Sequence, residues 1–253
     1  MVKAGQYREE KQYYTRPIFI EQFTATWCPY CYSVAMALDR IQEETNLSEV
    51  IIVAYHNSDG YQTSYGNGRF SYYGVGGVPT VIINGLYRQG GGNPRGDGEA
   101  GILESYNRVM DVIDGLRNEM HTDRPFTVEM VGEVTLSNPS FDVYINAVNG
   151  YPNPVRVVGL MVEDEIPVSA SNGLRELNYT VGRYLGATTL QPTETSGALV
   201  QISSYGETTS YSPTADPRPV VFLQDTVTKE IVGASGTIQA EQILENPSWA
   251  LYE

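Results

Sequence analysis

Residues 23–31, FTATWCPYC, contain both cysteines of the chain, Cys28 and Cys31. An apolar run at residues 18–20 precedes them and is typical of a strand that is buried on both faces. Apolar residues at positions 34, 38 and 41 follow at helical spacing. Pro29 fits the first turn of a helix, because its missing N–H has no partner there. The sequence therefore predicts a strand, then a helix that opens at residues 27–29 and carries the cysteines.

Two thiols three residues apart at a helix start face the same side and are close enough to form a disulfide. The helix N-terminus carries a positive potential, which stabilises a thiolate at Cys28. We therefore expect Cys28 to attack a disulfide and Cys31 to resolve the resulting mixed disulfide. A permanent structural disulfide is disfavoured, because closing so short a ring removes little chain entropy. An inert pair, or a half-site in which Cys28, Cys31 and His56 bind a soft metal ion, remains an alternative.

The rest of the first half continues this alternation of strand and helix. Residues 50–55 predict a second buried strand that ends at His56, and residues 81–83 predict a third. Asn84-Gly85 is typical of a tight hairpin. Residues 57–74 are polar and predict a long loop or a short helix. Apolar positions from 102 to 120 predict a long amphipathic helix that packs on the sheet.

After His121 the apolar period changes from 3.6 to 2, which is typical of strands. Several short strands separated by Pro and Asn-Gly turns predict an antiparallel β-sandwich. The expected domains are residues 1–121 and residues 122–253, the second with a short C-terminal tail. The expected strands of the second domain lie at residues 126–130, 141–147, 155–162, 198–202, 220–223 and 231–232.

Composition limits the partners of the protein. The 253 residues carry a formal net charge of -14, and a surface this acidic repels nucleic acid and anionic lipid. No apolar stretch approaches the ~18–20 residues that span a bilayer, so a soluble chain is expected. Residues 1–6 lack the apolar segment of a signal peptide, so we expect any leader to be absent from this sequence.

On two of its segments the chain resembles the thioredoxin superfamily. Residues 23–31 are similar to its active-site segment, and Val78-Pro79-Thr80 matches its cis-proline segment. The resemblance covers residues 15–120 and implies an α/β thioredoxin-like domain with a cis bond before Pro79. It also implies that the Val78 backbone pairs with a bound substrate strand. On the residues alone, Pro79 could instead merely start a strand.

One position departs from the thioredoxin pattern. Where that family has a buried Asp, this chain has Gln22, which cannot titrate. Glu21 is adjacent, but strand alternation turns it to the other face. We therefore expect proton transfer through water, or a poorer reductant than thioredoxin.

Two aromatic residues and one histidine flank the cysteines. We expect Trp27 and Tyr30 to shape the approach to the thiols, although Trp27 is equally compatible with a plug in the core. We interpret His56 as a polar residue at the end of a strand. The alternative is that it serves as a metal ligand or as an acid/base group.

The two-part arrangement also resembles the Omp28-related family of bacterial exported proteins. A thioredoxin-like module followed by a β-rich module that ends at residues 220–232 fits that family. The resemblance implies an immunoglobulin-like second domain and an extracytoplasmic location, in the periplasm, at the outer membrane or secreted.

Together these features predict a thiol–disulfide oxidoreductase that acts on protein thiols and disulfides outside the cytoplasm. It needs no organic cofactor, because the cysteine pair carries the electrons. The alternative is an exported binding or assembly protein whose sandwich docks an unknown protein partner, with the cysteines as a metal clip or redox sensor. The direction of the redox reaction stays open.

Overall fold

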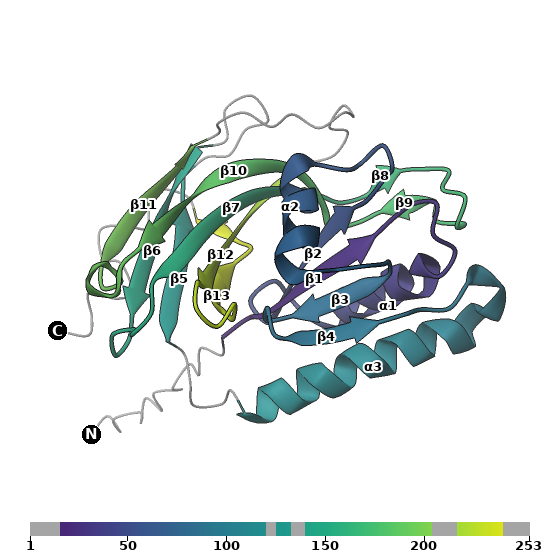
Figure 1. Cartoon of the computed structure of the whole chain (residues 1–253), viewed down its shortest axis with the longest axis horizontal. Coiled ribbons are helices and arrows are strands. Elements are labelled where there is room, and N and C mark those ends of the chain that lie inside the picture. The colour runs from purple at the N-terminus through teal and green to yellow at the C-terminus, as the bar shows by residue number, and fades with distance from the viewer. Residues whose placement is uncertain (1–15, 120–124, 133–139, 204–216, 240–253) are drawn as a thin grey trace, which may run out of the picture.

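The computed structural model describes residues 16–119, 125–132, 140–203 and 217–239. The expected domain boundary at 121–122 and the expected C-terminal tail lie outside these ranges. Over the described ranges the chain forms a mixed α/β part followed by a sheet-rich part (Figure 1). At this level the expected fold class is confirmed. Within the described ranges, no helix is both long enough and apolar enough to cross a membrane.

The first part has helices on both faces of a small group of strands (Figure 1). β1 lies between β2, to which it is parallel, and β3, to which it is antiparallel. Helices α1 and α3 contact each other, and α2 lies over the other face of the strands. The elements are β1 (Ile18–Thr24), α1 (Cys31–Glu44), β2 (Val50–His56), α2 (Ser64–Tyr73), β3 (Thr80–Ile83), β4 (Tyr87–Gly90), a 3-10 turn (Arg95–Asp97) and α3 (Gly98–Glu119).

Most of these elements follow the expected pattern. Every residue of β1 and β2 is buried, as an apolar run predicts for strands covered on both faces. Residues 57–74 contain α2, which begins where the Thr63 hydroxyl accepts a hydrogen bond from the Gly66 N–H. It ends at Gly74, whose φ of 60° is left-handed and suits glycine.

The start of α1 differs from the prediction. The helix begins at Cys31, so Pro29 precedes it and Cys28 lies in a turn in front of its N-terminus. The Cys28 N–H donates to the Ala25 carbonyl and the Cys31 N–H donates to the Cys28 carbonyl. These are turn contacts, and apolar spacing inside a helix does not show where its first turn closes.

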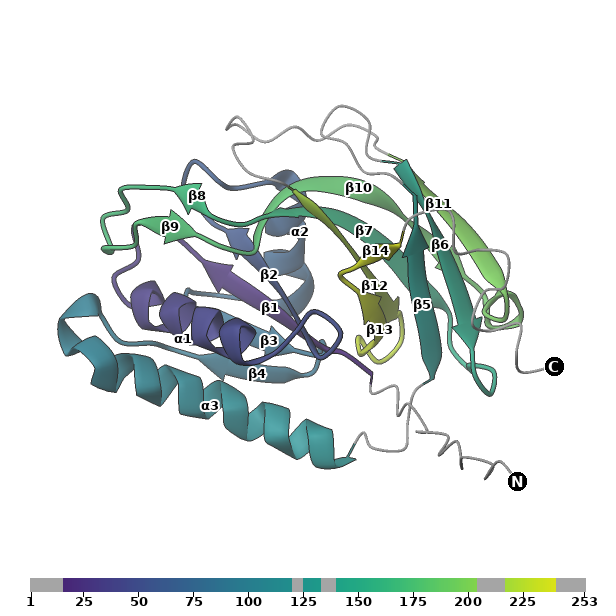
Figure 2. The ribbon, with the colours of Figure 1, turned by 180° about the vertical axis from the view of Figure 1, so that it is seen from behind.

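The second part consists of two layers of strands (Figure 2). One layer has the order β11-β6-β5-β14, and the other contains β7, β10, β12 and β13. Their facing side chains form a separate apolar core. The elements are β5 (Phe126–Val131), β6 (Ser140–Ala147), β7 (Val155–Glu163), β8 (Ile166–Pro167), β9 (Glu176–Leu177), β10 (Thr180–Leu190), a 3-10 turn (Pro192–Glu194), β11 (Ala198–Ser203), β12 (Arg218–Asp225), β13 (Ile231–Ser235) and β14 (Ile238–Gln239).

A single eight-stranded sheet runs through both parts, in the order β13-β12-β7-β10-β2-β1-β3-β4. The connection is made where β10 runs parallel to β2, with Thr180 opposite Ala54. Strands β7 and β12 therefore supply side chains to both cores. On β7, Val158 and Leu160 belong to the core of the first part, whereas Val157 and Met161 belong to that of the second. The sheet is thus continuous across the two expected domains.

The connecting strand β10 is absent from the sequence prediction. Its pairing with β7 shifts register between Val181 and Arg183 and again between Tyr184 and Gly186. Such bulges interrupt the alternation of buried and exposed side chains on which strand prediction depends.

Residues 164–179 connect β7 to β10 and reach back over α1. We call this segment the hairpin arm, because it contains the short pair β8 and β9. Its buried residues Ile166, Leu174 and Leu177 pack near Tyr32 and Met36 of α1. The arm therefore brings residues from the second half of the chain to the segment that carries the cysteines (Figure 2).

Candidate redox site

Cys28 and Cys31 lie together at the end of β1 and the start of α1, and both are free thiols. Both are buried, with Cys31 fully so. Both belong to one small apolar cluster with Ala25. The structure therefore brings the two predicted thiols together, as disulfide exchange requires.

The cis-proline segment lies against the first thiol. The Val78–Pro79 peptide bond is cis, in agreement with the geometry that the resemblance implies. The Cys28 thiol donates to the Val78 carbonyl oxygen, with a distance of 3.5 Å between sulfur and oxygen. Val78 also packs against the small apolar cluster that contains both cysteines. Four of the predicted site residues are thus brought together.

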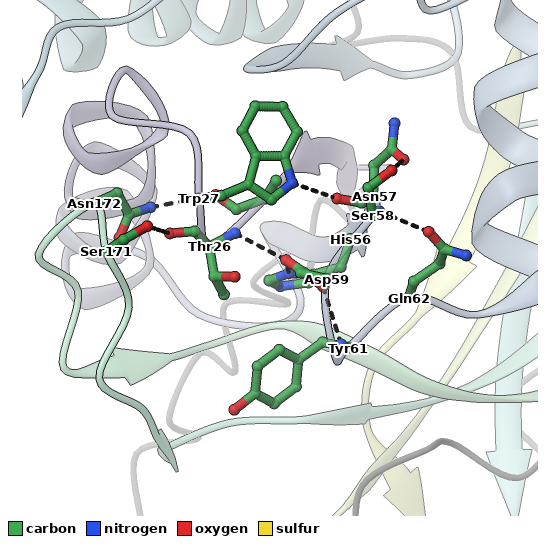
Figure 3. Close-up of polar contacts among 11 residues, drawn as sticks. Thr26, Trp27, His56, Asn57, Ser58, Asp59, Tyr61, Gln62, Ser171 and Asn172 are labelled. Atoms are coloured by element: carbon green, nitrogen blue, oxygen red, sulfur yellow. Dashed lines mark hydrogen bonds and ion pairs between the residues drawn. The ribbon is translucent and has the colours of Figure 1, made fainter.

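Two aromatic side chains flank the thiols at the surface. Trp27 is 50% exposed and Tyr30 is 53% exposed, so Trp27 is not a core plug. The indole N–H of Trp27 donates to the Asn57 carbonyl at 3.0 Å, which holds the ring against the loop after β2 (Figure 3). The pair forms an exposed aromatic border around otherwise buried sulfurs.

The surroundings of Cys31 favour its protonated form. Burial raises the pKa of the Cys31 thiol far above its ordinary value, and the hydrogen bond with Cys28 raises it further. A hydrogen bond with the Thr24 side chain acts in the opposite direction and lowers it. Cys31 therefore reacts as a thiolate only if a neighbouring group takes up its proton.

His56 is paired with an acidic residue that the sequence analysis did not single out. Its Nδ1 lies 2.8 Å from Asp59 Oδ2, and both side chains are almost completely buried (Figure 3). Asp59 also accepts hydrogen bonds from the Thr26 and Tyr61 N–H groups. Burial by itself would raise the pKa of the Asp59 carboxyl, but these hydrogen bonds outweigh it and lower the pKa below the usual value.

The structure does not assemble the metal site considered above. Among the residues it describes, no three His, Cys, Asp or Glu side chains form a group that could hold a metal ion. Cys28, Cys31 and His56 are therefore not brought together as a ligand set. His56 instead bonds Asp59.

The hairpin arm holds the segment that leads into the cysteines. The Asn172 side-chain amide donates to the Ala25 carbonyl at 3.3 Å, and its backbone N–H donates to the Thr26 carbonyl at 3.2 Å. The Ser171 hydroxyl also donates to the Thr26 carbonyl (Figure 3). Ala25 and Thr26 are thus bound from the second half of the chain, immediately before Trp27.

A small cavity of about 20 Å³ lies between the sheet, α1 and the hairpin arm. Gln22, Thr24 and His56 line it from the sheet, and Asp39 lines it from α1. Gln22 thus faces α1, whereas Glu21 bonds Arg69 of α2, as strand alternation predicts. Burial raises the pKa of the Asp39 carboxyl, although hydrogen bonds from Asn178 and Tyr179 act in the opposite direction. The remaining lining residues are Ala25, Thr26, Ala35, Ala54, Leu174, Glu176, Leu177, Asn178 and Tyr179.

The loop after β4 also packs against the site. A Cβ atom at Gly92 would lie 2.2 Å from the Tyr30 carbonyl oxygen and 3.1 Å from Pro79 Cγ. Only glycine allows the loop to approach the cysteine turn and the cis-proline this closely.

Sequence reasoning missed Asp59, Asn172 and Gly92. The pair His56 and Asp59, three residues apart after a strand, was the one signal available for any of them. Asn172 and Gly92 reach the site only through contacts distant in sequence, which no local pattern reports.

Comparison with known proteins gives a likeness of fold. No protein-family model matches the chain, and no curated protein does. Among solved structures, HBP35 of Porphyromonas gingivalis has a TM-score of 0.62 at 15% sequence identity. The alignment covers 88% of this chain and 74% of that chain. At this identity the likeness shows a shared fold of mixed α/β and sheet-rich parts.

A further structure shares much less with the chain. It is Pseudomonas fluorescens alkylpurine DNA glycosylase AlkC bound to DNA containing an abasic site analog, with 17% identity and a TM-score of 0.22. That alignment covers 54% of this chain and 36% of the other. A score this low carries no argument about fold or function.

Proposed function

We propose that this protein is a thiol–disulfide oxidoreductase that acts on protein thiols and disulfides. The observation that carries the proposal is the contact of two free thiols, Cys28 and Cys31, beside the Val78 carbonyl and the cis bond to Pro79. Disulfide exchange needs a nucleophilic thiol, a second thiol within reach and a surface that aligns the substrate.

Each of these roles has a candidate residue. Cys28 attacks a substrate disulfide and forms a mixed disulfide, and Cys31 then attacks Cys28 and releases the substrate thiol. The Val78 backbone aligns an extended substrate segment, while exposed Trp27 and Tyr30 border its approach. No organic cofactor takes part, since the cysteine pair holds the two electrons.

The finer architecture and the location belong to the same proposal. The first part is thioredoxin-like over residues 1–121, and the second is an immunoglobulin-like sandwich over residues 122–253. The arrangement of strand, cysteine turn, helix and cis-proline supports the former. The two-layer packing of β5, β6 and β11 on β7 and β12 supports the latter. The Omp28-related resemblance favours an extracytoplasmic protein.

The test is equilibration of the purified protein in glutathione buffers of graded potential, followed by trapping of free thiols. The expected result is reversible closure of a Cys28–Cys31 disulfide that Cys28→Ser and Cys31→Ser both abolish. A potential near ~-120 mV identifies a disulfide donor, and one near ~-270 mV identifies a reductant. Failure of the pair to close at any potential would refute the proposal.

A further inference from the structure

The buried position of Cys31 raises the question of where its proton goes. The residue is 0% exposed and lies behind Cys28. A thiol reacts as its thiolate, and burial disfavours that form. Solvent does not touch this sulfur in the structure, which makes groups inside the protein candidate acceptors of its proton.

Thr24 connects the surroundings of Cys31 with the cavity. Its side chain lies close enough to the Cys31 thiol to lower the pKa of that thiol, and it also lines the cavity. His56 is the register partner of Thr24 on β2 and lines the same cavity. About 20 Å³ is enough for one water molecule, because a buried water needs roughly 10–15 Å³ of such volume and polar partners.

Asp59 prepares His56 to accept a proton. The 2.8 Å contact of His56 Nδ1 with Asp59 Oδ2 places the imidazole proton on Nδ1, because an ionised carboxylate only accepts hydrogen bonds. In the neutral imidazole the other ring nitrogen, Nε2, then carries the lone pair that can accept a proton. The Thr26 and Tyr61 N–H groups bind the same carboxylate and hold it in place. Figure 3 shows this arrangement beside Trp27.

We propose that His56, oriented by Asp59, accepts the proton of Cys31 through the Thr24 hydroxyl and one water molecule in the cavity. The inference rests on the proposed function. As the Cys31 sulfur bonds the Cys28 sulfur, the bond between Cys28 and the substrate sulfur breaks and the substrate leaves as a thiolate. The Cys31 proton passes to Thr24, Thr24 passes its own proton to the water, and the water protonates His56 Nε2. The substrate disulfide is reduced and the cysteine pair is oxidised, so electrons balance.

Other titratable groups face His56 or its cavity. Asp39 is the principal competitor as proton acceptor, but it lies two helical turns beyond Cys31 along α1. His56, in contrast, lies opposite Thr24 in the register of β1 and β2. The groups that face the imidazole or its cavity are Asp59 and Tyr61 from the loop after β2, Asp39 from α1, and Glu176 and Tyr179 from the hairpin arm.

The test separates the two thiol steps with the chromogenic disulfide 5,5′-dithiobis(2-nitrobenzoate). Attack by Cys28 releases one nitrothiobenzoate, and attack by Cys31 on the mixed disulfide releases the second. We expect the second release to slow by about 10²-fold in His56→Gln. The first release, measured in the Cys31→Ser background, should stay unchanged and shows that the variant is folded.

The pH profile gives a readout that a purely structural role would not alter. The rate of the second release should rise more steeply with pH in His56→Gln than in the wild type, because hydroxide must then take up the Cys31 proton. Thr24→Val should slow the same step, and Asp59→Asn should slow it less than His56→Gln, because the imidazole remains.

Asp39→Asn is the matched control, since it removes a second acid from the same cavity. It should leave the second release near the wild-type rate. An unchanged rate and pH profile in His56→Gln would overturn the inference, as would equal slowing by Asp39→Asn. Absence of a second release in the wild type would instead refute the proposed function itself.

Discussion

The Arg69 guanidinium donates to the Glu21 carboxylate across 2.6 Å, and both side chains are almost fully excluded from solvent. The Tyr73 hydroxyl donates to the same carboxylate at 2.6 Å, and Arg69 also donates to the Gln224 side chain at 2.7 Å. This network joins α2 to β1 and to β12, which come from opposite halves of the chain. The network therefore holds α2 against one face of the sheet, and Gln22 and the cavity lie on the opposite face.

Removal of one partner of this pair should destabilise the protein strongly. In Glu21→Gln the Arg69 charge stays buried without its counter-charge, which costs about 3–5 kcal/mol of the free energy of unfolding. Urea denaturation of the variant measures the loss. The double variant Glu21→Leu/Arg69→Met is the control, and it should recover most of the stability because no buried charge remains. A loss below about 1 kcal/mol in Glu21→Gln would contradict the prediction.

Asn172→Ala should loosen the segment before Cys28. The variant loses the hydrogen bond to the Ala25 carbonyl and the one from the Leu174 N–H. Each buried group that is left unpaired lowers the free energy of unfolding by about 1–3 kcal/mol. We expect a changed equilibrium constant of the cysteine pair with glutathione and faster alkylation of Cys28. Ser171→Ala removes one exposed contact to the same loop and should have a much smaller effect. Equal effects of the two variants would argue against a positioning role for Asn172.

Gly92→Ala should distort the site from outside the cysteine segment. The new Cβ would overlap the Tyr30 carbonyl oxygen, so the loop or the cysteine turn must move. We expect a lower Tm and altered reactivity of Cys28 toward iodoacetamide. Gly90→Ala is the matched control, because a Cβ there meets nothing within 4 Å. Normal reactivity in Gly92→Ala would show that the loop does not support the site.

Asp39→Asn should stabilise the folded protein at neutral pH. Burial raises the pKa of the folded Asp39 carboxyl, so the wild type loses stability as pH rises from the unfolded pKa through the folded one. An amide has no such cost and its oxygen keeps the bond from Asn178, which is 3.1 Å in the wild type. Thermal unfolding at several pH values should show a gain at pH 7 that disappears in acid. A gain independent of pH would contradict this reading.

The local features of the redox segment could be predicted because they depend on neighbouring residues. The apolar run of β1, the helical spacing of α1 and the alternation that separates Glu21 from Gln22 are all short-range patterns. The spacing of Cys28 and Cys31 indicates their chemistry before any contact is known. The one local error is the start of α1, which begins at Cys31.

Only the tertiary structure decided which parts of the chain contact these elements. The sequence by itself determined that two thiols follow the end of a buried strand, because the apolar pattern of neighbouring residues indicates that strand. It did not determine that β10 pairs with β2, that Asn172 binds the loop before Cys28, or that Gly92 touches Tyr30. Each of these contacts joins residues distant along the chain, and a periodic pattern shows which face is buried without showing what covers it.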